Sequence, residues 1–91
     1  MKDIKLLELD DARKVFEELG FVYQDLTCFN DGLYDVELLC NYSSKGAIVR
    51  EMIIRCGDTK ARVNFEGHDL DEDSLKHAFL SCKDFFESVY K

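Results

Sequence analysis

Hydrophobic and polar side chains alternate along residues 33–42. Every second side chain in this segment is apolar: Tyr34, Val36, Leu38, Cys40 and Tyr42. Asp35 and Glu37 stand between them. Because successive side chains of an extended chain point to opposite faces, this pattern predicts a strand with one apolar face and one solvated face. We expect this strand to lie at the centre of a sheet.

A period of three to four residues predicts a helix near each end of the chain. Over residues 10–19 the apolar side chains fall on one stripe: Ala12, Val15, Phe16 and Leu19. Asp10 or Asp11 is expected to cap this helix, and Gly20 is expected to end it in a left-handed conformation. A similar stripe continues through residues 71–89, which we predict to form the second helix.

Three further segments are typical of strands that pair with the central one. They cover residues 21–29, 48–56 and 60–66. Pairing Asp35 with Arg55 and Tyr42 with Ile48 keeps the apolar residues of both strands on one face. A slip of one residue would turn Glu51 into the core, so this register is expected.

The pairing of the first strand depends on the turn at residues 30–32. A three-residue loop would bury one set of side chains: Val22, Gln24, Leu26 and Cys28. A two-residue turn would bury the other set: Phe21, Tyr23, Asp25 and Phe29. We favour the first arrangement, because an amide costs less to bury than a carboxylate.

These elements predict an α+β fold of order α-β-β-β-β-α. The expected architecture has two layers, a four-stranded antiparallel sheet and two flanking helices, most simply on one face. Ninety-one residues suit a single domain, residues 1–91. No apolar run approaches the ~20 residues needed to cross a bilayer, and no apolar segment follows Met1 as in a secretory signal. The cysteines lack close pairs, as is typical of a reducing compartment, so we expect the protein to be cytoplasmic.

The formal net charge of −7 is concentrated in two segments without lysine or arginine, residues 21–42 and 66–73. We expect carboxylates of these segments to contact a protein partner with a basic surface: Asp35, Glu37, Glu66, Asp69, Asp71, Glu72 and Asp73. Helix capping explains part of the second group, since Asp71 suits the N-cap and the next two acids suit the positive end of the helix dipole.

The outer face of the sheet is a second candidate surface. With the expected registers, Phe21, Tyr23, Phe29 and Leu33 lie on it, and Leu39, Val49 and Ile53 lie at its centre. Apolar clusters on an uncovered sheet face favour protein contacts. The alternative function is therefore a module that forms a homodimer or docks on a scaffold protein through Leu39, Val49 and Ile53.

The sequence contains no recognisable catalytic or metal-binding motif. His68 and His77 are nine residues apart, and zinc sites usually show closely paired ligands. Glycine-rich phosphate loops and nucleophile elbows are missing as well. We therefore expect no cofactor, no metal site and no enzyme activity. The negative charge also argues against direct binding of nucleic acid or of anionic membranes.

In size, acidity and helix–sheet–helix layout the chain resembles small phage-encoded inhibitors, including several anti-CRISPR proteins. The acidic stretches 31–37 and 66–73, which flank a short antiparallel sheet, carry this resemblance. It implies an inhibitor that occupies a surface meant for nucleic acid. The preferred functional prediction is a non-catalytic inhibitor or regulator whose carboxylates mimic DNA phosphates on a nucleic-acid-handling enzyme, such as a CRISPR nuclease.

Overall fold

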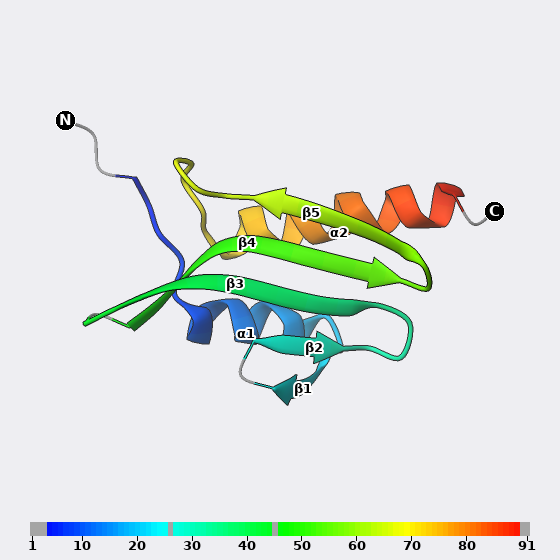
Figure 1. Cartoon of the computed structure of the whole chain (residues 1–91), viewed down its shortest axis with the longest axis horizontal. Coiled ribbons are helices and arrows are strands. Elements are labelled where there is room, and N and C mark those ends of the chain that lie inside the picture. Colours follow the sequence, from blue (N-terminus) through cyan, green and yellow to red (C-terminus); the bar gives the residue numbers. More distant parts are fainter. Residues whose placement is uncertain (1–3, 26, 45, 90–91) are drawn as a thin grey trace.

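The computed structural model describes residues 4–25, 27–44 and 46–89 (Figure 1). Over these residues the chain forms α1 (Leu9–Glu18), β1 (Val22–Asp25), β2 (Cys28–Asn30), β3 (Asp35–Ser43), β4 (Gly46–Cys56), β5 (Thr59–Asn64) and α2 (Glu72–Val89). The described strands form one antiparallel sheet of five strands, in chain order. The predicted α+β class is confirmed. The predicted number of four strands is wrong, because the first expected strand is a hairpin of two.

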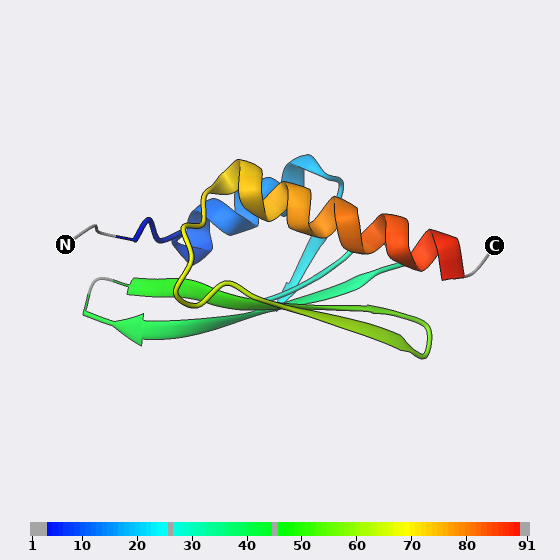
Figure 2. The same ribbon diagram turned by 90° about the horizontal axis from the view of Figure 1, so that it is seen from above.

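Both helices cover the same face of the sheet and leave the opposite face bare (Figure 2). We call the bare side the outer face. The two helices also run in the same direction, so that both begin at one end of the molecule (Figures 1 and 2). This two-layer arrangement agrees with the sequence prediction, and it decides which side chains can meet a partner.

Aromatic rings hold the helices to the sheet. The Phe16 ring of α1 lies 5.3 Å from the Phe21 ring, 5.3 Å from the Phe29 ring and 5.7 Å from the Phe79 ring, between centroids. Phe79 of α2 also meets the Tyr34 ring edge to face at 6.0 Å. Such ring pairs add to the free energy gained from burying their apolar area. The core is therefore centred where α1, β2 and α2 meet.

The predicted pairing of β3 with β4 is confirmed in its first half and wrong in its second half. Asp35 pairs with Arg55, but a β-bulge follows Leu39, and Arg50 is the additional residue. Tyr42 therefore pairs with Ala47 rather than with Ile48. The bulge also returns Val49 to the helix-covered face, where it is buried in the core.

The favoured register of the first strand is wrong. Phe29 pairs with Val36 across a four-residue connection, and both side chains are buried in the core. Val22 is exposed and Cys28 is half-buried, while Leu26 lies outside the described residues. A bulge between Tyr23 and Asp25 leaves the Asp25 carboxylate exposed. The sequence favours the three-residue loop because that loop avoids burying the Asp25 carboxylate. In the observed register that carboxylate is exposed, so its burial costs nothing.

The helix ends follow the sequence closely, with one correction. α1 begins after Glu8, whose side chain forms no capping hydrogen bond, so neither Asp10 nor Asp11 is the N-cap. Both aspartates lie in the first turn instead, where they still complement the helix dipole. Gly20 ends α1 with a φ of +94°, as expected for a glycine in this position.

Candidate functional site

The start of α2 carries most of the carboxylates that were expected to contact a partner. Asp71 is the N-cap, because its Oδ1 accepts a hydrogen bond of 2.7 Å from the Ser74 N–H. The Ser74 hydrogen bonds and the nearby Lys5 charge lower the pKa of the Asp71 carboxyl. Asp69 Oδ1 accepts a hydrogen bond of 2.7 Å from the Lys5 N–H. Two predicted contact residues thus make hydrogen bonds within the fold, whereas three others are exposed to solvent: Glu66, Glu72 and Asp73.

The fold brings the start of α1 to the same place. The Lys5 carbonyl accepts a hydrogen bond of 2.9 Å from the Leu70 N–H, which ties the segment before α1 to the segment before α2. Both helices begin at this end of the molecule (Figures 1 and 2). We call this region the acidic helix end, and it comprises Glu8, Asp10, Asp11, Glu66, Asp69, Asp71, Glu72 and Asp73.

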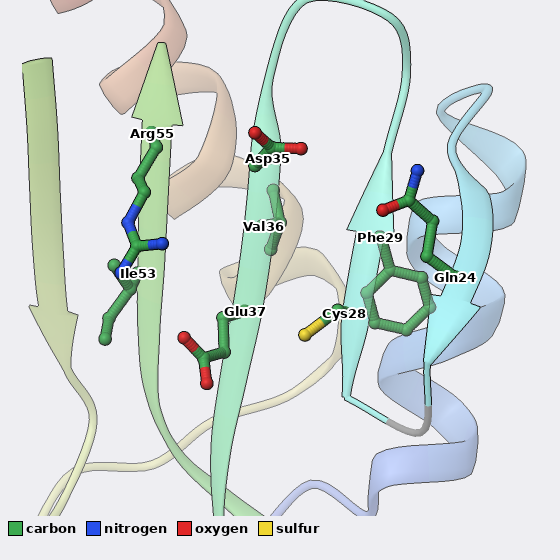
Figure 3. A pocket seen from close by; sticks show the side chains of 8 residues that line it. All are labelled: Gln24, Cys28, Phe29, Asp35, Val36, Glu37, Ile53 and Arg55. Carbon is green, nitrogen blue, oxygen red and sulfur yellow. The ribbon is translucent and has the colours of Figure 1, made fainter. Parts of the chain in front are cut away.

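The other two predicted contact residues, Asp35 and Glu37, lie apart from the acidic helix end. They belong to β3 and point to the outer face (Figure 3). Asp35 accepts a hydrogen bond from the Asn30 side chain and lies opposite Arg55. The structure therefore divides the predicted carboxylates into two separate groups, and only the group at the helix starts is a dense one.

Asp35 and Glu37 line a shallow hollow of about 190 Å³ in the outer face. Figure 3 shows Arg55 and Cys28 on the neighbouring strands of the same hollow. Its volume falls below the ~300–1,000 Å³ that is usual for ligand pockets. Because a guanidinium stands among its carboxylates, the hollow is not a row of negative charge. We interpret it as part of a solvated sheet face.

Glu51 shows how the outer face balances its own charges. It is the buried charged residue within the described segments, and its two oxygens face two arginines. Arg50 lies 3.2 Å from Oε2, and Arg62 lies 3.9 Å from Oε1. Since both arginines are partly exposed, these pairs contribute modestly to stability. They nevertheless satisfy a carboxylate that would otherwise be costly to bury.

Among the described residues, the outer face does not show the exposed apolar centre that the sequence predicted for self-association. Val49 is buried in the core, as the bulge at Arg50 requires. Ile53 does point outward but is only 5% exposed, and Leu39 is half-buried. Phe21 and Phe29, also expected on this face, lie in the core. The placement of Val49, Phe21 and Phe29 on the outer face was thus wrong.

Exposed apolar surface occurs instead where α2 ends. A groove of about 350 Å³ lies between the loop after β2, the β4–β5 turn and the last turns of α2. We call it the apolar groove, and it is lined by Leu33, Tyr34, Cys56, Gly57, Phe86 and Glu87. Sequence reasoning missed this site. The adjacent pair Phe85–Phe86 could have indicated it, because only one of two neighbouring rings on a helix can face the core and the other must be exposed.

Two of the cysteines are poorly suited to act as nucleophiles. Burial raises the pKa of the Cys40 and Cys82 thiols, which disfavours the thiolate that a nucleophile needs. No group of three or more histidine, cysteine, aspartate or glutamate side chains is placed to hold a metal ion in the part of the chain that the structure describes. Within the same residues, no helix has both the length and the apolar character to span a membrane.

Comparison with known proteins found no matching family model, curated protein or solved structure. The resemblance to phage-encoded inhibitors therefore stays a prediction from size, charge and layout.

Proposed function

We propose that this protein is a non-catalytic regulator or inhibitor that binds a basic surface of another protein through its acidic helix end. The observation that supports this is the gathering of two acidic helix starts, remote in sequence, at one end of the molecule (Figure 2). The outer face, with its paired charges and covered apolar residues, supports binding less well.

The local charge is larger than capping requires. Lys5 contacts Asp71 at 3.8 Å, and each helix dipole is equivalent to roughly half a positive charge. Together these offset only about a quarter of the eight carboxylates of the acidic helix end. The remaining negative field would steer association with a lysine- and arginine-rich surface and raise the association rate at low salt.

Surfaces rich in lysine and arginine are typical of proteins that bind nucleic acid. The partner that we propose is therefore a nucleic-acid-handling enzyme, and the resemblance described above suggests a CRISPR nuclease as one example. The contacts that we assign to it are the exposed carboxylates Glu66, Glu72 and Asp73, with Asp10 from α1. Asp35 and Glu37 lie on a different surface and are left out of this contact.

The test begins with identification of partners by affinity capture from the source cells, followed by measurement of binding with purified proteins. The Glu72→Lys/Asp73→Lys double variant reverses two exposed charges of the acidic helix end. Glu18→Lys/Asp58→Lys is the matched control, because it changes the net charge equally at exposed positions elsewhere. Melting curves of both variants establish that each is folded.

We expect the first variant to weaken binding at least about tenfold, the control to change it little, and added salt to weaken the wild-type complex steeply. Nucleic acid should compete for the partner. A partner whose affinity is insensitive to salt, and to reversal of Glu72 and Asp73, would contradict the proposal.

A further inference from the structure

The apolar groove is at the opposite end of α2 from the acidic helix end. Phe86 lies fourteen residues after Glu72, which is roughly 20 Å along a helix axis. The groove's volume of about 350 Å³ lies at the lower end of the ~300–1,000 Å³ range of small-ligand pockets. The groove is therefore separate from the acidic helix end. Its volume is sufficient for a few apolar groups of a side chain.

The wall formed by Leu33 is held in place by its own turn. Asp31 Oδ1 accepts hydrogen bonds from the Leu33 N–H at 2.9 Å and from the Tyr34 N–H at 2.7 Å. Asn30 Oδ1 accepts another from the Gly32 N–H at 2.7 Å. This network fixes the backbone of the turn, so Leu33 is presented to solvent by an ordered loop.

Leu33 in the groove and two apolar side chains in the last turns of α2 are exposed. Leu33 is 63% exposed, and Phe85 and Val89 on α2 are 56% and 51% exposed. Phe85 lies next to the fully buried Phe86, with 5.9 Å between ring centroids. An exposed leucine on the rim of a concave apolar surface favours a binding site over a solvated end.

The charges around the groove are negative. Glu87 lines it directly. The pKa of Tyr34 is raised mainly by burial, and the charges of Cys56, Glu87, Asp31 and Asp84 raise it further. A ligand that enters this groove therefore meets the apolar Leu33 and the Glu87 carboxylate, and the Asp31 carboxylate lies in the same turn as Leu33.

We propose that the apolar groove binds an apolar side chain that is flanked by lysine or arginine in a segment of a partner protein. The apolar side chain would lie against the exposed Leu33, over a floor formed by Tyr34, Cys56 and Phe86, and the cation would meet Glu87. A second copy docked groove to groove would bring the same carboxylates against each other, which disfavours a symmetric dimer through this surface. The groove does not depend on the binding proposed for the acidic helix end.

Nuclear magnetic resonance with short blocked peptides tests this assignment. The probes are Lys-Leu-Phe-Lys, Glu-Leu-Phe-Glu and Lys-Ser-Ser-Lys, added to the isotope-labelled full chain. We expect the first peptide to shift the amide signals of Leu33, Gly57 and Glu87 at up to millimolar concentration. The second and third peptides should shift them much less, because each lacks one of the two required features.

Variants make the test specific to the groove. Leu33→Ser and Glu87→Lys should each weaken binding of Lys-Leu-Phe-Lys at least about fivefold. Glu87→Lys should also improve binding of Glu-Leu-Phe-Glu. Val22→Ser is the matched control, since Val22 is an equally exposed apolar residue on β1. It should leave both affinities unchanged.

Three results would overturn the assignment. The first is the absence of shifts at the groove with the Lys-Leu-Phe-Lys peptide. The second is equal binding of the peptides that carry opposite charges, or equal loss in Val22→Ser and Leu33→Ser. The third is a set of groove shifts that depends on protein concentration alone, which would identify a second copy as the occupant.

Discussion

Val36 illustrates how strictly the central strand defines its core residues. Its side chain is 1% exposed and lies between Phe29 on β2 and Ile54 on β4. A carboxylate at this position would lose its hydration without gaining a partner. Val36→Asp should therefore cost about 4 kcal/mol or more. Because small domains are stable by only about 5–15 kcal/mol, thermal melts followed by circular dichroism should show a largely unfolded protein.

Val22→Asp is the control for that substitution. The Val22 side chain is 66% exposed at the edge strand β1, so its replacement should change stability by no more than about 0.5 kcal/mol. If Val36→Asp melted at the wild-type temperature, β3 would not be the central buried strand.

Asp71 makes part of the stability depend on pH. Hydrogen bonds from Ser74 lower the pKa of its carboxyl in the folded state. A lowered folded-state pKa means that the stabilisation is present above the unfolded value of about 3.9 and is lost as the pH falls through the folded value. Asp71→Asn keeps a capping oxygen but cannot titrate. The stability advantage of the wild type over Asp71→Asn should therefore shrink as urea titrations are moved from neutral to acidic pH.

An advantage of the wild type that is the same at every pH would show that the charge of Asp71 does not stabilise the start of α2. Its capping role would then rest on the neutral hydrogen bond alone.

At the scale of elements, the clearest predictions came from segments in which only one face is apolar. The first half of the β3–β4 register could be predicted because a slip would have turned Glu51 into the core. The bulge could not, because Arg50 is merely left without a partner residue in β3, and no local sequence pattern marks such a position. One inserted residue was enough to move Val49 from the outer face to the core.

The hairpin of β1 and β2 shows a second limit of sequence reasoning. Burying the Asp25 carboxylate would be costly if the first strand were unbroken. The bulge between Tyr23 and Asp25 interrupts the strand, so Phe21 and Phe29 can lie in the core without burial of the Asp25 carboxylate. The free energy of burying two phenylalanines outweighs the loss of regular pairing. Choosing between these registers required the positions of the rings on α1 and α2.

Phe16 is the residue through which α1 is joined to both other elements of the core. Its ring is fully buried and contacts rings on β2 and α2. Phe16→Ala should destabilise the fold by about 3–5 kcal/mol, since it leaves a cavity where three elements meet. Phe85→Ala removes the same side chain from an exposed position of α2 and should cost about 0.5 kcal/mol or less. Equal effects in urea denaturation would contradict this account of the core.

At the scale of the whole molecule, the distribution of charge could be predicted only in part. The acids of residues 66–73 were visible as a cluster in the sequence, whereas Glu8, Asp10 and Asp11 belong to the same surface only because the helices run in the same direction (Figure 1). Asp35 and Glu37 do not belong to that surface, because β3 presents their side chains on the outer face (Figure 3). Which carboxylates act together is a property of the helix arrangement.

The same distribution predicts the state of association. The net charge of −7 makes two copies repel. The outer face holds charged pairs around Glu51 rather than an exposed apolar cluster, and the apolar groove is bordered by carboxylates that a second copy would also carry. Light scattering over a concentration series at low salt should therefore give a mass near 10.6 kDa throughout. Leu39→Lys should leave that mass unchanged. A mass that rises with concentration in the wild type and returns to the monomer in a folded Leu39→Lys variant would contradict this prediction and identify the outer face as a dimer interface.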